Sequence, residues 1–332
     1  MRTLLFTGPG GSGRTTTAAA TALTAAREGT RTLLLGTDRT DTLGPVLGDA
    51  ATPHLTVRRV DPDTDFRTDL AALQDRAASA LDLLGASRLD PEEIAPLPGA
   101  EELAVLRALR PVLGRLAGVP MPAEWLYGTA ARLDLELAAV EAVLADRDTL
   151  VRLVAEPGPS GADAVRAATL GLALRGLRVD ALVATRVLPE SEAGGWLAGP
   201  VAQQRKTLEE WQESYAVHPV THLGRDPRGG DDLAALAVPG AGAEPGAVSW
   251  PVTDSAADDG VLVWHIPLPG ARRDELDLIR RGDELVVTAG PFRRIVPLPS
   301  ALRRCTVDGA ALREGALRVR FRPDPELWPR TR

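Results

Sequence analysis

The chain of 332 residues contains one cysteine, one lysine and no apolar run as long as the roughly 18 residues that a membrane-spanning helix requires. The single thiol, Cys305, excludes an internal disulfide and the CxxC pairs of structural zinc sites. The N-terminus also lacks a secretory cleavage pattern. We therefore expect a cytoplasmic protein with no zinc and no stable membrane insertion.

Histidine is scarce as well, and its positions form no catalytic motif. None of His54, His218, His222 and His265 has the HExxH spacing of zinc hydrolases. His218 and His222 are four residues apart, but Pro219 between them would break a helix. The histidine pattern therefore disfavours a metal site and an unrelated class of enzyme.

The net charge of −7 is distributed unevenly along the chain. Residues 261–332 carry 14 arginines against 9 acidic residues, a balance of +5, so residues 1–260 carry −12. The acidic majority of the chain disfavours nucleic acid as a partner. The arginine pairs near the C-terminus could form a basic face for an anionic partner, but adjacent residues on a strand point to opposite sides. We therefore favour the interpretation that these arginines are simply exposed to solvent.

The apolar pattern at the start of the chain predicts a β-α-β unit. Thr3–Thr7 and Arg31–Leu35 are short buried-strand patterns, and the Ala/Thr-rich stretch Thr15–Glu28 between them is a helix pattern closed by Gly29. Such a unit implies a parallel sheet with a right-handed crossover. Asp38 follows the second strand, at the sheet edge where ligands bind in open α/β folds.

About residues 63–147 form a predicted helical subdomain, because apolar residues recur there at spacings of three, four and seven. Its apolar stripe fits an ordinary helical core, which we favour, or a groove for a client segment. The buried strands Thr149–Ala155 and Ala181–Val187, on either side of the helix Ala162–Leu174, then resume the parallel sheet. We place this α/β domain at residues 1–240.

The C-terminal part has a different period. The Pro/Gly/Ala-rich stretch Val238–Val248 predicts a linker, which we place at 241–254. Beyond it, residues 255–332 alternate with a period of two, which predicts an antiparallel β-sandwich. The predicted strands are Val261–Ile266, Leu276–Arg280, Glu284–Thr288, Phe292–Val296 and Ala316–Phe321.

A glycine-rich loop lies between the first strand and the first helix, which is the context that a phosphate-binding loop requires. Glycines let successive backbone N–H groups converge on phosphate oxygens, and a helix N-terminus adds partial positive charge. A threonine hydroxyl at the start of the helix can ligate Mg²⁺. The candidate nucleotide-binding residues are Gly8, Gly10, Gly11, Ser12, Gly13, Arg14, Thr15 and Thr16.

This loop resembles that of the deviant P-loop family containing the arsenite-pump ATPase and the ATPase that targets tail-anchored membrane proteins, which reads G-K-G-G-x-G-K-T-T. Three further segments agree with the family. The first switch, the P-G-x-E segment and the V-x-N-R-V-L-P segment correspond to Leu35–Leu43, Pro98–Glu102 and Val183–Pro189. The resemblance covers about residues 1–240 and implies a P-loop ATPase domain that uses Mg-ATP.

By the same resemblance, individual residues acquire expected roles. Asp38 would orient the attacking water, and Thr15 would ligate Mg²⁺. Thr185 and Arg186 would lie near the adenine, where the family has Asn-Arg. Family members work as dimers with nucleotide at the interface, so a homodimer or an intact paralogue is an expected partner.

Residues 261–321 separately resemble the α-crystallin domain of small heat-shock proteins, which is known behind some members of this ATPase family. Leu268–Gly270, the hairpin at Gly282-Asp283 and Gly315–Leu317 fall where that family has its strand-ending P-G, a hairpin and a late G-x-L. The chain has no C-terminal I-x-I docking motif. Large oligomers of the small-heat-shock type are therefore disfavoured.

The departures from the ATPase pattern fall on the chemistry. Pro9 stands where the family's signature lysine reaches across the dimer, and Arg14 stands where a lysine contacts the β- and γ-phosphates. A guanidinium and an ammonium fill different spaces, and proline removes an N–H donor. The family's strand ending in D-T-A-P-T-G, which carries the second switch and a metal-shell aspartate, is missing between Glu102 and Thr149.

Three functions remain open from the sequence. We favour a degenerate ATPase-like protein with weak or absent hydrolysis, for which Mg-ATP binding is in doubt and which binds hydrophobic client segments or pairs with an intact paralogue. The alternatives are a working ATPase in which Arg14 replaces the lysine, and a nucleotide-independent binding module. Asp38 would be catalytic only in the working enzyme and could otherwise be a helix N-cap. Arsenite export is disfavoured because one cysteine cannot form a thiolate site.

Overall fold

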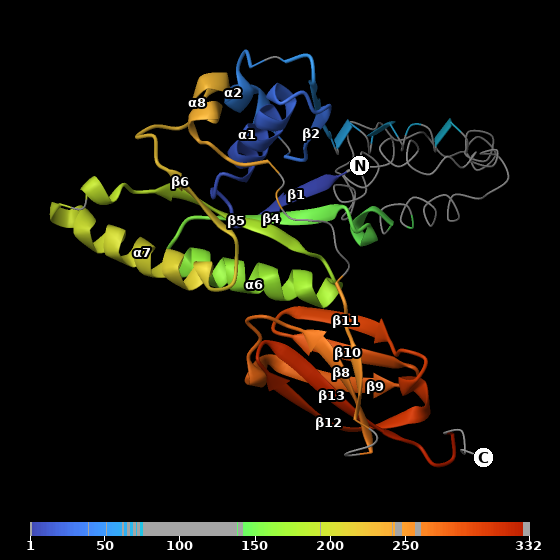
Figure 1. Ribbon diagram of the computed structural model, residues 1–332. Helices are drawn as coiled ribbons and strands as arrows, with labels where there is room; N and C mark the ends of the chain where they lie inside the picture. The colour runs from blue at the N-terminus through green and yellow to red at the C-terminus, as the bar shows by residue number, and fades with distance from the viewer. Residues whose placement is uncertain are drawn as a thin grey trace. The chain divides into compact units, whose positions relative to one another are not determined.

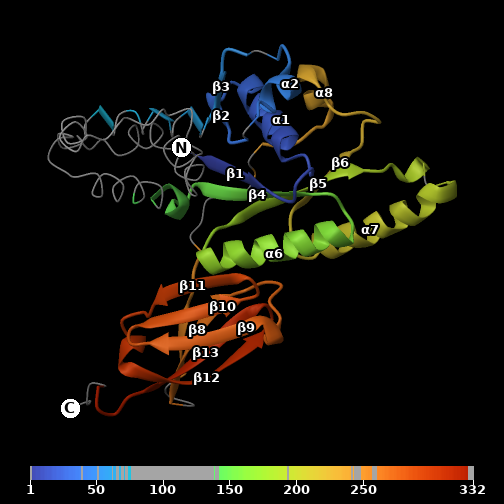
Figure 2. The ribbon, with the colours of Figure 1, turned by 180° about the vertical axis from the view of Figure 1, so that it is seen from behind.

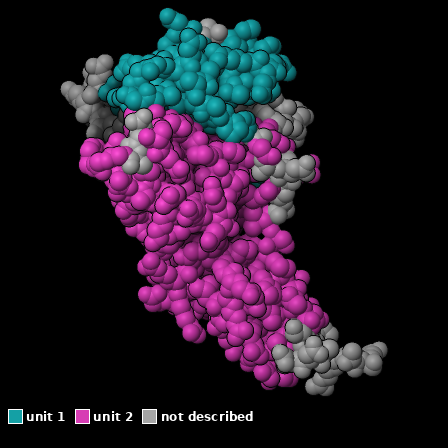
Figure 3. All heavy atoms as spheres, turned by 60° about the vertical axis from the view of Figure 1, so that its left-hand side comes forward, with its two compact units in different colours: residues 1, 15–146, 223–240 teal, residues 2–14, 147–222, 241–332 magenta. Residues whose placement is uncertain are grey.

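The computed structural model divides the chain into two compact units, coloured separately in Figure 3. The first comprises residues 15–146 and 223–240, and the second residues 2–14, 147–222 and 241–332. The structure describes residues 2–38, 40–50, 52–61, 142–192, 194–240, 248–255 and 260–327. It also describes the single positions 63, 64, 67, 68, 71, 74, 75, 138 and 242. Most of the predicted helical subdomain 63–147, with the P-G-x-E segment, lies outside the described residues.

The second unit contains a four-stranded parallel sheet in the order β1-β4-β5-β6. Its strands are β1 (Thr3–Thr7), β4 (Thr149–Ala155), β5 (Val179–Val187) and β6 (Val217–Thr221). Every residue of β4 is buried, as expected for a central parallel strand. The predicted strands at Thr3–Thr7, Thr149–Ala155 and Ala181–Val187 are confirmed.

Two helices cover one face of this sheet, as Figures 1 and 2 show. Helix α6 (Pro159–Arg175) follows β4, and α7 (Ala198–Gln212) precedes β6. Two short 3-10 turns, Glu190–Glu192 and Gly195–Leu197, precede α7. Val165 of α6 and Trp211 of α7 are buried in one apolar cluster with residues of β4 and β5. The prediction of helix Ala162–Leu174 is confirmed, with three more residues at its N-terminal end and one more at its C-terminal end.

The first unit contains a separate parallel pair, β2 (Thr32–Gly36) and β3 (Leu55–Arg59). Its described helices include α1 (Arg14–Arg27), α2 (Leu43–Leu47) and α8 (Gly229–Ala235). The prediction that β2 belongs to the same sheet as β1 is wrong, because β2 is hydrogen-bonded to β3 alone among the described strands. A parallel strand needs an adjacent strand to join a sheet, and no described strand links β1 with β2.

The C-terminal part is an antiparallel sandwich, as predicted. One sheet has the order β12-β13-β8-β7 and the other the order β11-β10-β9. The first contains β7 (Val252–Ser255), β8 (Val261–Pro267), β12 (Cys305–Arg313) and β13 (Ala316–Pro323). The second contains β9 (Leu276–Arg281), β10 (Glu284–Ala289) and β11 (Phe292–Pro297), and 3-10 turns lie at Arg273–Glu275 and Leu302–Arg304. The sandwich begins at Val252, inside the predicted linker, and β12 was not predicted.

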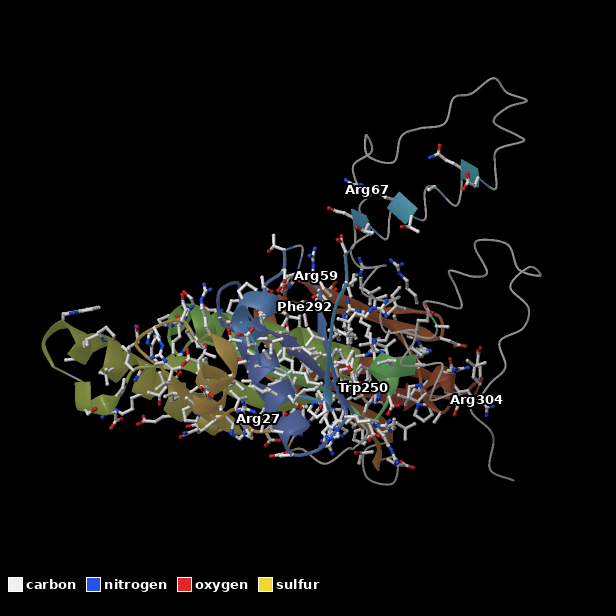
Figure 4. All side chains as sticks on the ribbon, turned by 90° about the horizontal axis from the view of Figure 1, so that it is seen from above. Arg27, Arg59, Arg67, Trp250, Phe292 and Arg304 are labelled. Atoms are coloured by element: carbon white, nitrogen blue, oxygen red, sulfur yellow. The ribbon has the colours of Figure 1, made fainter. Side chains whose placement is uncertain are left out.

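Helix α6 also forms part of the sandwich core. Leu170 and Leu174 are buried in the same apolar cluster as Trp264, Val287 and Phe321. A β-carbon on Gly171 would lie 2.9 Å from ring atoms of Phe292, which Figure 4 labels, so glycine allows the close approach. Helix α6 therefore has one apolar stripe toward the parallel sheet and another toward the sandwich.

A buried ion pair lies in the middle of the parallel sheet. The side chains of Arg152 on β4 and Asp180 on β5 are 0% and 1% exposed. Arg152 Nε donates to Asp180 Oδ2 at 3.0 Å, and Nη2 donates to the same oxygen. The guanidinium carbon also lies 5.9 Å from the ring centroid of Phe6 on β1. The pair connects three adjacent strands in a region that excludes water.

None of the helices in the part of the chain that the structure describes is long and apolar enough to cross a bilayer. The described residues also contain no cluster of three or more histidine, cysteine or acidic side chains placed to hold a metal ion.

Candidate functional site

The glycine-rich loop leaves the carboxyl end of β1 through a position that only glycine fits. A β-carbon on Gly8 would lie 1.9 Å from the carbonyl oxygen of Val154 on β4. The Ser12 N–H then donates to the Pro9 carbonyl at 3.3 Å and closes a turn. Gly11 and Gly13 have φ of 77° and 85°, in the left-handed region that favours glycine. The sequence thus folds into a tight loop directly before α1.

Thr185 on β5, two strands away from β1 in the sheet, holds this loop. Its hydroxyl donates to the Ser12 carbonyl at 2.8 Å, and both residues are buried. The Ser12 Oγ atom is also buried and has no hydrogen-bond partner among the described residues. The position expected near the adenine is thus engaged with the phosphate loop itself.

A bulge at the end of β5 directs Thr185 toward the loop. The register between β5 and β6 shifts between Ala184 and Val187, and Arg186 has φ of 54°. A non-glycine residue in this left-handed conformation costs about 1–3 kcal/mol and persists only where its surroundings hold it. The Arg186 guanidinium forms an ion pair with Glu156, just beyond β4, and both side chains are about half exposed. The bulge and the ion pair therefore fix the edge of the sheet beside the loop.

In the first unit, Asp38 is the centre of a small hydrogen-bonded cluster. Thr15 Oγ1 at the start of α1 donates to Asp38 Oδ2 at 3.1 Å, and Thr42 Oγ1 donates to the same oxygen at 2.5 Å. Asp38 lies two residues beyond β2. The structure therefore brings together the two residues predicted for magnesium and for water activation.

The oxygen atoms of Thr15 and Asp38 are of the type that Mg²⁺ prefers. A bound ion would take these oxygens as ligands directly or through water. The groups expected to compensate phosphate charge fit less well. Arg14 and Gly10 are exposed, Thr16 is half-buried, and Pro9 has neither charge nor N–H donor. The cluster thus retains metal-type oxygens while the loop lacks a lysine ammonium.

Sequence reasoning does not find two of these residues. Thr42 has no signature beyond its place in the first-switch segment, and Glu156 lies just beyond β4, 30 positions from its partner Arg186 on β5. The sequence does point to Thr185, but as an adenine contact, whereas its hydroxyl bonds a carbonyl 173 positions away in sequence. Only the fold shows these distant pairings.

We expect Thr185→Val to loosen the phosphate loop, because valine keeps the shape of threonine and removes the hydroxyl that bonds Ser12. Amide hydrogen exchange at residues 11–14 should accelerate by about fivefold to tenfold, equivalent to the roughly 1 kcal/mol of one hydrogen bond. Thr185→Ser retains the hydroxyl and should behave as wild type. Equal exchange in wild type and Thr185→Val would contradict this role.

Comparison with known proteins identifies two regions. Residues 1–115 match the family model of the anion-transporting ATPase, and residues 259–321 match the HSP20-like domain found in ArsA. An uncharacterized Streptomyces coelicolor protein is 64% identical over 390 residues, covering 100% of both chains. A Mycobacterium tuberculosis protein is 32% identical over 415 residues, covering 99% of this chain and 97% of its own. A Prosthecochloris vibrioformis protein provisionally named an arsenical pump-driving ATPase is 26% identical over 388 residues, covering 97% and 96%.

Proposed function

The chain belongs to the ArsA-like ATPase family and carries that family's HSP20-like domain, and on this premise we propose that it is a degenerate member with weak or absent hydrolysis. It would act by binding hydrophobic client segments or by regulating an intact partner. The single observation that carries the proposal is the loss of lysine from the phosphate loop. The chain's one lysine, Lys206, lies on α7 beside Glu210.

The chemistry of phosphoryl transfer makes this loss important. Catalysis of this reaction depends almost entirely on positioned charge around the γ-phosphate and its metal ion. Arg14 presents a broad planar cation where the family has a compact ammonium, and its side chain lies at the exposed start of α1. Pro9 removes the second cation altogether. The charge stabilisation left for a transition state is small.

The missing second-switch segment is a further reason. The alignment with the Streptomyces relative spans 390 positions, whereas this chain has 332 residues, so 58 aligned positions have no residue here. A gap of this length is large enough to include the segment that would carry the Walker-B-type aspartate.

A working ATPase is the second candidate, and one observation favours it. The side chains of Thr15 and Asp38 are hydrogen-bonded to each other, as expected of two residues that together bind Mg²⁺. Arsenical transport has no such support. Cys305 is buried, and burial is the main reason that its pKa lies above the usual value for a thiol. A single buried thiol cannot form the several thiolates that a metalloid site needs.

Pairing with an intact paralogue is the expected consequence of losing the trans-acting lysine at Pro9. A partner that retains the trans-acting lysine could complete one of two sites in a dimer. Affinity purification of the tagged chain from its native host at native expression should recover a P-loop ATPase with the lysine in place. Recovery of this chain alone would argue for a homodimer or monomer.

The nucleotide chemistry is tested by calorimetric titration with Mg-ATP and Mg-ADP, together with phosphate release under excess Mg-ATP. We expect no turnover above a buffer blank for wild type or Arg14→Lys, because restoring one lysine ammonium leaves the metal shell incomplete. The affinity of Arg14→Lys for Mg-ATP should nevertheless rise by about tenfold, comparable to one charge-assisted hydrogen bond.

Asp38→Asn is the matched control for these measurements. If wild type releases phosphate and Asp38→Asn does not, the chain is a working ATPase and the proposal is wrong. If neither nucleotide binds wild type, Arg14→Lys or Asp38→Asn, the chain functions without nucleotide, and the degenerate-site proposal is replaced by a pure binding module.

A further inference from the structure

The outer faces of the two sandwich sheets differ in how their charges are satisfied. On the four-stranded sheet, the outward-facing arginines of β13 are paired with acidic side chains. Arg318 contacts Glu314 at 2.6 Å, and Arg320 and Arg322 contact Asp308 at 3.6 and 3.2 Å. Each of these three arginines thus has an acidic partner within the sandwich, two of them sharing Asp308.

The outer face of the three-stranded sheet has an apolar row instead. Val286 on β10 lies opposite Ile279 on β9 and Ile295 on β11 in the strand register. Ile279 and Ile295 are 40% and 55% exposed, although the alternate residues of the same strands face the core. Cross-strand rows of this kind pack well against another apolar surface.

Charged residues lie on both sides of this row. On one side, Asp277 of β9 and Arg293 of β11 lie in register with Thr288, and on the other, Arg281 of β9 lies opposite Glu284 of β10. All four charged side chains are exposed, and none forms an ion pair with another residue that the structure describes. Val286 itself is 1% exposed, so the apolar surface of the face is that of the two isoleucines on either side of it. The face therefore has two exposed isoleucines, balanced charge and four charges available to a partner.

We propose that this face, formed by the outward residues of β9, β10 and β11, binds the same face of a second copy of the chain. The charge pattern is complementary to itself. A two-fold axis running across the strands along the apolar row would place Asp277 opposite the partner's Arg281. Arg293 would then lie diagonally beside the partner's Glu284. Each isoleucine of the row would face its own counterpart, as an isologous interface requires.

The size of the face predicts a weak complex. Strands of six residues are about 20 Å long, and three of them are about 15 Å wide. Such a face buries less than the roughly 1,200 Å² of total area that characterises stable interfaces. When this face is the contact between two copies, their association is therefore weak and depends on protein concentration. The association is stronger where another contact already brings the two copies together.

Site-directed disulfide formation tests the geometry in the full chain. The one native thiol, Cys305, is buried and 2% exposed, so an introduced surface cysteine is the reactive group. Ile295→Cys and Ile279→Cys should each form a disulfide-linked dimer under mild oxidation. Arg320→Cys, on the outer face of the other sheet, is the matched control and should form several-fold less. Equal yields at the three positions, or no dimer at either isoleucine position, overturn the proposal.

Charge reversal tests the orientation of the two copies. Sedimentation should show that Asp277→Arg weakens self-association by about tenfold or more, because Arg would face the partner's Arg281. Adding Arg281→Asp should restore it, since the reversed pair is again complementary. A client-binding face predicts no self-association in any variant, and that outcome also overturns the proposal. Unchanged tryptophan fluorescence confirms that each variant retains the sandwich.

Discussion

Asp180→Asn should lower the free energy of unfolding by about 3–5 kcal/mol, because it removes the negative charge that faces a fully buried guanidinium. Arg152 is 0% exposed, and two of its nitrogens donate to one oxygen of Asp180. The loss is measured by urea unfolding followed through tryptophan fluorescence.

The control replaces both members of the pair. Arg152→Met with Asp180→Leu removes the two charges together and fills the space with apolar atoms, and such replacements are often neutral or stabilising. The double variant should therefore be more stable than Asp180→Asn. If Asp180→Asn lowers the free energy of unfolding by less than about 1 kcal/mol, the guanidinium is solvated by water or paired with another anion. The ion pair would then contribute little to stability.

A neighbouring histidine reports the same change independently. His218 on β6 lies in register with Val183 of β5. Burial first, and then the charge of Arg152, lower the pKa of His218, whereas Asp180 raises it. Removing the Asp180 charge should therefore lower the pKa of His218 further, which an NMR titration would detect. Arg152→Met should raise it.

The sequence predicts the elements whose pattern is unambiguous. The short apolar runs of β1 and β4 and the Ala/Leu-rich pattern of α6 are compatible with few other secondary structures. Strand β6 was missed because it contains Pro219, which an edge strand tolerates. Strand β12 was missed because its small and polar residues, including Gly309 at a bulge, lack an apolar alternation.

Pairing between elements was harder to predict than the elements themselves. The pattern of β2 identifies a strand but not its neighbour, so its separate sheet with β3 could not be foreseen. The same limit applies to the site. The glycine loop was located from its motif, whereas the Thr185–Ser12 bond joins residues far apart in sequence. Short-range patterns determine local conformation, and long-range contacts depend on the complete fold.

Leu170→Ala combined with Leu174→Ala should destabilise the sandwich by roughly 5 kcal/mol or more, since each buried leucine truncated to alanine loses about 2–5 kcal/mol. Both side chains are 1% exposed within the sandwich core, yet both belong to the helix that covers the parallel sheet. The sandwich core is therefore incomplete without α6. Wild type should accordingly unfold the parallel sheet and the sandwich in one transition.

The double variant separates these two parts. With the contact removed, the sandwich should unfold at lower urea concentration than the parallel sheet, visible as two transitions in tryptophan fluorescence. Leu172→Ala is the matched control, because Leu172 packs on the sheet side of the same helix and should leave a single transition. A single transition in the double variant, with less than about 1 kcal/mol lost, would mean that α6 merely rests on a self-sufficient sandwich. Two transitions would show that the HSP20-like domain is built onto the ATPase-like fold through one shared helix, so that a change in the parallel sheet could alter the stability of the sandwich.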